Sequence, residues 1–160
     1  MNILIAYYSM TGHTQKVCQL LAEMLGADLE RIEALKESGL AVKGMKAAFN
    51  MKSDIKPCRT DMDDIDFMVV ATPVWAGHFT PYINKYLSIL SNCRDTPFSV
   101  LAEMNKSGGD KAIEQVRKSL EKKGMQFVSS AVTIEEDVET YRFIDTVSKL
   151  SDSIKKYING

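Results

Sequence analysis

The most informative chemical feature of the sequence is a turn rich in hydroxyl groups, Ser9-Met10-Thr11-Gly12-His13-Thr14, between an apolar run and an amphipathic helical pattern. Backbone N–H groups at the start of a helix are unpaired and lie at the positive end of its dipole, so they favour an anion. Ser9, Thr11 and Thr14 add donors, and Gly12 permits close approach to phosphate oxygens. The turn therefore predicts a phosphate site. The alternative is that these hydroxyls only cap the helix.

Two further loops carry residues suited to an aromatic ligand. Ala71-Thr72-Pro73-Val74-Trp75-Ala76-Gly77-His78 contains the only tryptophan of the chain, and an exposed tryptophan offers a flat face for stacking. The alternative is a tryptophan buried in the core. Asn105-Lys106-Ser107-Gly108-Gly109 offers hydrogen-bonding side chains, flexible backbone and one cation. Together with the phosphate turn, these loops predict a mononucleotide that carries a large flat aromatic system.

The elements between these loops predict how they are positioned. Apolar runs indicate buried strands over residues 3–8, 67–72, 98–104 and 127–134, and a run with interleaved charges indicates an edge strand over residues 29–32. Helical patterns separate the strands, so we expect an α/β fold, doubly wound in three layers, with a five-stranded parallel sheet. The expected strand order is 2-1-3-4-5, with the ligand crevice at the carboxyl ends of strands one and three.

The helix boundaries follow from capping residues and apolar spacing. Gly26 is placed to end the first helix, Thr80-Pro81 to begin the second, and Asp110 to cap a third that ends at Gly124. A fourth helix is predicted from about residue 139 to residue 157, burying Ile144, Val147, Leu150 and Ile154. The long segment 36–57 is predicted to lie against the domain, with a short amphipathic helix that contains Met45, Ala48 and Phe49.

Composition excludes several classes of function. The 160 residues fit one domain, and a formal net charge of -1 indicates neither nucleic acid nor an anionic membrane as a partner. No apolar run reaches membrane-spanning length, and the first strand begins too early to leave room for a signal peptide. Three widely spaced cysteines suit free thiols in a reducing compartment, so the expected location is cytoplasmic.

The motifs Ser9-x-Thr11-Gly12-x-Thr14 and Thr72-Pro73-Val74-Trp75-Ala76-Gly77 resemble those of the flavodoxin family, over nearly the whole of residues 1–160. The resemblance implies non-covalent FMN, with its phosphate in the first loop and its isoalloxazine ring between Trp75 and Ser107. It also implies electron transfer between redox partner proteins, a reductase and an acceptor. The FMN-binding residues expected from it are Ser9, Met10, Thr11, Gly12, His13, Thr14, Thr72, Pro73, Val74, Trp75, Ala76, Gly77, Asn105, Lys106, Ser107 and Gly108.

The glycine after Ala76 suggests a redox switch in the second loop. Gly77 tolerates positive φ, so the Ala76–Gly77 peptide is expected to rotate and present a carbonyl to the flavin N5–H, stabilising the neutral semiquinone. The alternative is that Gly77 only permits a tight turn.

Three departures from the family pattern bear on function. The chain is nearly neutral, the third loop lacks the tyrosine that often stacks on the outer flavin face, and Lys106 lies where the family often avoids a cation. An open flavin face leaves room for a second substrate, and a cation at Lys106 would favour the anionic reduced flavin.

The sequence therefore leaves three functions open. An FMN electron carrier, as a monomer or weak dimer, is favoured. An FMN-dependent NAD(P)H:quinone or flavin oxidoreductase is the alternative, and binding of another phosphorylated aromatic ligand or of a protein is a third. No catalytic residue is predicted, and His13 and His78 lack the spacing of a metal site.

Overall fold

The computed structural model describes all 160 residues, and its centre is a parallel sheet with the predicted strand order β2-β1-β3-β4-β5. The strands span Ile3–Tyr7 (β1), Asp28–Arg31 (β2), Phe67–Pro73 (β3), Pro97–Met104 (β4) and Gln126–Ile134 (β5). Each lies within a residue or two of the predicted range. The short, charged β2 lies at the edge of the sheet, as its interleaved charges predict.

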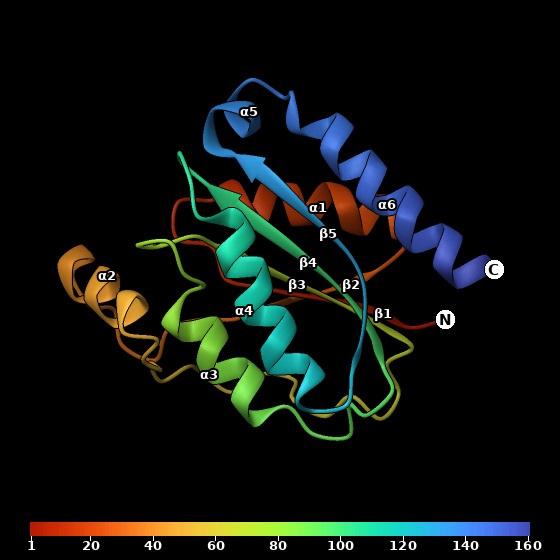
Figure 1. Cartoon of the computed structure of the whole chain (residues 1–160), viewed down its shortest axis with the longest axis horizontal. Coiled ribbons are helices and arrows are strands. Elements are labelled where there is room, and N and C mark those ends of the chain that lie inside the picture. The colour runs from red at the N-terminus through yellow and green to blue at the C-terminus, as the bar shows by residue number, and fades with distance from the viewer.

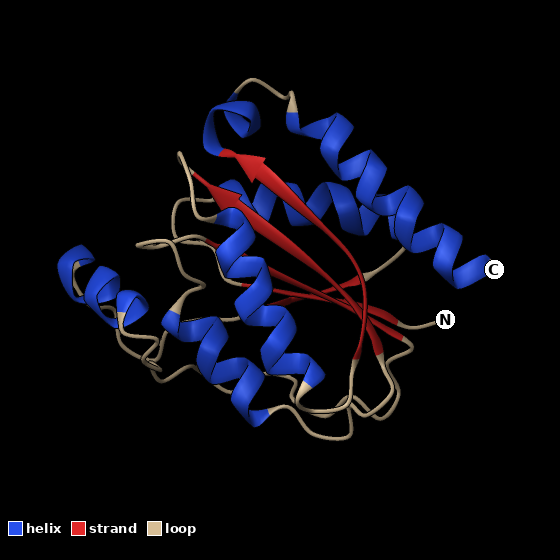
Figure 2. Cartoon of the chain, in the orientation of Figure 1, coloured by secondary structure: helices blue, strands red, loops and turns tan.

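Helices cover both faces of the sheet, as a doubly wound fold requires (Figures 1 and 2). The helices α1 (His13–Leu25) and α6 (Phe143–Asn159) bury one set of apolar side chains, among them Val17, Leu21, Val147 and Leu150. On the opposite face, α3 (Pro81–Ile89) and α4 (Gly109–Glu121) bury another set, among them Ile83 and Val116. The α/β, three-layer prediction is therefore confirmed.

The capping predictions are confirmed for two helices and wrong for a third. Gly26 ends α1 in the left-handed region, and the Thr80 side chain accepts a hydrogen bond from the N–H of Ile83 at the start of α3. The predicted cap at Asp110 is wrong, because Gly108, at φ 94°, is the N-cap of α4 and Asp110 lies in the first helical turn. A left-handed glycine turns the chain there without a side-chain cap.

The predicted fourth helix, from about residue 139 to residue 157, is α6 (Phe143–Asn159), which begins later than predicted, and a short helix before it was not predicted. Residues Glu135–Glu139 form the short α5, and α6 begins only at Phe143, because Tyr141 between them has a φ of 62° that interrupts the helix. Ile144, predicted to be buried, is exposed, and Phe143 is buried instead.

The excursion between β2 and β3 holds α2 (Leu40–Ala48), which lies apart from the sheet beside α3 (Figure 1). Its buried side chains are Lys43 and Ala47, whereas Met45 and Phe49 are exposed. The helix itself was predicted, but the sequence did not predict that its Lys43 and Ala47 face would be the buried one. No helix in the structure combines the length and apolar character that crossing a bilayer requires.

Candidate functional site

The loop between β1 and α1 presents free backbone donors. Gly12, at φ 97°, turns the chain into α1, and the Ser9 hydroxyl oxygen accepts hydrogen bonds of 3.2 Å from the N–H groups of Gly12 and Gln15. Ser9 therefore caps the helix. The N–H groups of Thr11, His13 and Thr14 have no acceptor within the protein. Unpaired N–H groups at the positive end of a helix dipole are suited to phosphate oxygens.

The loop after β3 is a tight two-residue turn. Trp75 and His78 exchange backbone hydrogen bonds of 2.9 Å in both directions, and the residues between them, Ala76 and Gly77, have φ values of 50° and 77°. Two positive φ values in a two-residue hairpin loop define a type I′ turn. Alanine in this region costs about 1–2 kcal/mol, so the turn holds a strained residue beside the candidate site.

Trp75 is half-buried rather than free. Its ring packs edge-on against Tyr8, with 5.5 Å between ring centroids, and against Tyr82, at 6.1 Å. The Lys43 ammonium of α2 lies 5.7 Å from the Trp75 ring centroid. Aromatic neighbours fix the plane of the indole, which leaves less of its surface open than the sequence suggested.

The loop after β4 touches the tight turn. A Cβ atom at Gly108 would lie 2.7 Å from the Cα of Gly77 and 3.0 Å from a methyl carbon of Val74, so only glycine fits there. Asn105 donates a hydrogen bond of 2.7 Å to Glu135 in α5. Lys106 and Ser107 are exposed, and no aromatic side chain lies between residues 105 and 109. Backbone contact therefore fixes the distance between the two loops.

A pocket of about 160 Å³ joins the three loops at the carboxyl edge of the sheet. The predicted site residues that line it are Met10, Thr11, His13, Thr14, Pro73, Val74, Trp75 and Asn105. Of the others, Ser9 is a cap, and Thr72 is buried and accepts a hydrogen bond from the N–H of Thr80. Gly12, Ala76, Gly77 and Gly108 shape the turns, whereas Lys106 and Ser107 lie outside the lining.

Glu103 is a buried acid in this pocket that sequence analysis missed. Its side chain is at the end of β4 and accepts a hydrogen bond of 3.3 Å from the Thr14 hydroxyl. Burial raises the pKa of the Glu103 carboxyl, and the nearby Glu135 raises it further, while His13 and Thr14 oppose the shift. A single acid in the apolar run Val100-Leu101-Ala102-Glu103 was the signal in the sequence that could have identified it.

His13 lies between two carboxylates of α5. Its Nδ1 is 3.4 Å from Glu135, and its Nε2 is 3.6 Å from Glu139. The three groups are close enough to hold a metal ion. The two carboxylates face different nitrogens of the imidazole ring, so His13 contacts both acids at once. These contacts tie α5 to the phosphate turn.

His78, the last residue of the tight turn, contacts helix α4. Its Nδ1 lies 2.6 Å from the Gln115 amide nitrogen and its Nε2 lies 3.2 Å from the Lys111 ammonium, both on α4. Burial and the Lys111 charge lower the pKa of His78, and the contact with Gln115 only partly offsets them. The lowered pKa favours the neutral imidazole, and the two contacts anchor the turn to α4.

Gly108→Ala tests the contact between the loops. The added methyl must displace the Gly77 backbone, and the residue must also keep a φ of 94°, so we expect the free energy of unfolding to fall by about 2 kcal/mol or more. Gly44→Ala, in α2, is the matched control, because nothing lies within 4 Å of its added Cβ. Urea unfolding measures both, and equal stability of the two variants would contradict the contact.

Glu103→Gln tests the buried acid. A raised folded-state pKa means that the folded protein binds this proton more tightly than the unfolded chain does. The carboxyl therefore lowers the free energy of unfolding as the pH rises above about 4.3, the ordinary pKa of glutamate. Glutamine cannot ionise, so the variant should gain stability relative to the unmodified protein between about pH 4 and about pH 8. Urea unfolding at both pH values measures the gain, with exposed Glu23→Gln as control. An equal difference in stability between Glu103→Gln and the unmodified protein at the two pH values would show that Glu103 has an ordinary pKa.

Comparison with known proteins agrees with this geometry. The family model described as NADPH-dependent FMN reductase matches residues 1–139. An NAD(P)H dehydrogenase (quinone) from Solidesulfovibrio magneticus is 30% identical over an alignment of 95 positions, which covers 54% of this chain and 47% of that protein. The chain thus spans about half the length of this curated relative.

Solved structures share the fold at low sequence identity. A flavoprotein from Lactobacillus acidophilus, solved in complex with FMN, has a TM-score of 0.71 at 15% identity and covers 88% of this chain and 98% of its own. Flavodoxin 2 from Bacillus cereus has a TM-score of 0.66 at 17% identity, with 98% and 99% covered. These matches confirm the flavodoxin-like fold, and the family model confirms FMN as the predicted ligand. The chain belongs to the NADPH-dependent FMN reductase family.

Proposed function

We propose that this protein is an FMN-dependent oxidoreductase that accepts hydride from a reduced nicotinamide dinucleotide and passes electrons to a quinone or a second flavin. The family model and the NAD(P)H dehydrogenase (quinone) support this reading. FMN, when bound, supplies the hydride and electron chemistry, and the protein supplies binding, orientation and electrostatics.

The residues of the pocket fit FMN. The free N–H groups of Thr11, His13 and Thr14 would hold its phosphate, and Trp75 would lie against its ring. Glu103 is a carboxyl close to the phosphate turn, and its raised pKa reduces the negative charge that the phosphate would meet. The His13 imidazole lies between Glu135 and Glu139, within 3.4 Å and 3.6 Å of their carboxylates.

The Trp75–His78 turn is the observation that carries the proposal over a one-electron carrier. Rotating the Ala76–Gly77 peptide by half a turn would change ψ of Ala76 by about 180° while its φ stays positive, and that region of backbone space is essentially restricted to glycine. Gly108 also approaches Gly77 so closely that there is no room for a Cβ between them. The rotation expected from the sequence is therefore costly in this chain, which supports two-electron chemistry over one-electron steps.

The loop after β4 leaves room beside the flavin for a second reactant. Asn105, Lys106 and Ser107 are exposed, and none of them has a ring that would cover the outer flavin face. Hydride transfer requires the donor to stack on that face, so an open face suits a reductase better than a carrier. The exposed Lys106 also favours binding of an anionic donor.

Stopped-flow mixing of the FMN-loaded protein with NADPH, under anaerobic conditions, tests the proposal. We expect the oxidised flavin absorbance to bleach without any other protein, and to return when a quinone is added. Flavin that stays oxidised until a separate reductase is supplied would contradict the proposal and support the electron-carrier function.

A further inference from the structure

Helix α2 turns a lysine, rather than its apolar side chains, toward the rest of the protein. Val42, Met45 and the C-cap residue Phe49 follow one another at helical spacing, and all three are exposed, Phe49 to 73%. The buried residues of the helix are Lys43 and Ala47. An amphipathic helix ordinarily buries its apolar stripe and leaves lysine in water. The orientation of α2 therefore indicates that the contacts of Lys43 have a specific role.

The Lys43 ammonium contacts an acid, a sulfur and an aromatic ring. Its Nζ lies 2.5 Å from a carboxylate oxygen of Glu37, 3.9 Å from the Met10 sulfur and 5.7 Å from the centroid of the Trp75 ring. Only 8% of the Lys43 side chain is exposed. A buried ammonium requires an acidic partner, and an ammonium within about 6 Å of an indole centroid is attracted to the ring. Lys43 therefore links α2 to Met10 and Trp75.

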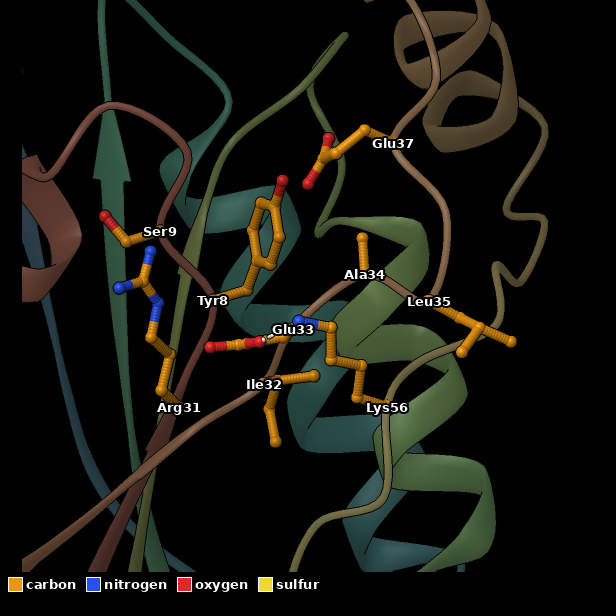
Figure 3. Close-up of a pocket in the computed structure, with 9 residues that line it drawn as sticks. All are labelled: Tyr8, Ser9, Arg31, Ile32, Glu33, Ala34, Leu35, Glu37 and Lys56. Carbon is orange, nitrogen blue, oxygen red and sulfur yellow. Dashed lines mark hydrogen bonds and ion pairs between the residues drawn. The ribbon is translucent and has the colours of Figure 1, made fainter.

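The Lys43–Glu37 pair contacts the wall of the FMN pocket without entering the pocket. Met10 and Trp75 line that pocket, and Lys43 does not. Glu37 borders the neighbouring cavity of about 410 Å³, where Figure 3 shows its carboxylate beside the hydroxyl end of the Tyr8 ring. Burial raises the pKa of the Tyr8 hydroxyl, and the Glu37 charge raises it further. The Tyr8 ring packs edge-on against Trp75, so the ion pair lies against an aromatic cluster that carries the pocket wall.

We propose that Lys43 is a positioning residue for FMN: its ammonium, held by Glu37, fixes the Trp75 indole and the Met10 side chain in the orientation that receives the flavin ring. Helix α2 then belongs to the FMN site, although none of its residues lines the pocket. The inference goes beyond the proposed function, because it concerns how FMN is held and applies equally to an oxidoreductase and to an electron carrier.

Lys43→Met tests the assignment, since methionine keeps an unbranched apolar side chain and removes the charge. Trp75 is the only tryptophan of the chain, so the intrinsic fluorescence of the FMN-free protein reports on this one indole. We expect acrylamide to quench Trp75 more strongly in Lys43→Met than in the unmodified protein. Calorimetric titration with FMN should show a dissociation constant raised roughly three- to tenfold, the worth of a partly desolvated cation–π contact.

Two further variants separate the charge of Lys43 from the attachment of α2. Lys43→Arg keeps a cation at the same position and should retain both the quenching and the FMN affinity of the unmodified protein. Lys46→Met is the matched control, because Lys46 lies in the same helix but its Nζ contacts the Ser53 hydroxyl instead of Trp75. Circular dichroism establishes that each variant is folded, and Lys43→Gln replaces Lys43→Met if the latter does not fold.

Unchanged Trp75 quenching and FMN affinity in folded Lys43→Met would overturn the assignment, even if urea unfolding showed a loss of stability, because Lys43 would then only attach α2. Equal losses in Lys43→Arg or in Lys46→Met would overturn it as well. Bleaching of the flavin by NADPH is measured separately on the unmodified protein. Its absence would remove the oxidoreductase function and leave the role of Lys43 intact.

Discussion

Parallel pairing of all five strands is the constraint on which the candidate site depends. Because β1, β3 and β4 run in the same direction, the loops that follow them leave the sheet at one edge. The chain order reverses between β1 and β3, since β2 lies on one side of β1 and β3 on the other. Such a reversal opens a crevice at the carboxyl edge of the sheet. The phosphate turn, the Trp75 turn and the Gly108 loop meet there.

At that edge of the sheet, backbone N–H groups that attract an anion lie close to acidic side chains that repel one. Three free N–H groups favour a phosphate, yet Glu103, Glu135 and Glu139 lie close by. Burial favours the neutral form of Glu103, and His13 pairs with the two acids of α5. A Glu103 held toward its neutral form repels the anion at the helix start less than a full carboxylate would. The acids therefore contribute to the electrostatic potential of the site, and the contacts of Glu135 and Glu139 with His13 tie α5 to the phosphate turn.

Apolar runs and capping residues predicted much of this fold. The strand ranges and order follow from buried, β-rich runs, and the three loops follow from their position between those runs and the helical patterns. Thr80 and Gly26 act locally, so their roles could be predicted from neighbouring residues. The break at Tyr141 could not, because the apolar spacing continues across it and only the backbone dihedral interrupts the helix.

Features that depend on long-range contacts were beyond sequence reasoning. Glu103 and Thr14 are 89 positions apart, and the match of Gly108 to Gly77 requires both loops to be in place. The exposed apolar side chains of α2 reflect its position beside α3, away from the sheet. The cost of rotating the Ala76–Gly77 peptide also depends on the left-handed conformation of Ala76, which the sequence does not reveal.

An anaerobic reductive titration of the FMN-loaded protein, compared with Ala76→Gly, tests the central claim most directly. A turn locked by a left-handed alanine predicts a single two-electron step in the unmodified protein. Ala76→Gly releases the turn and should separate the titration into two one-electron steps, while Ala48→Gly, in exposed α2, should behave as the unmodified protein does. Two well-separated one-electron steps in the unmodified protein would contradict the claim, because they would require a turn that rotates freely despite Ala76.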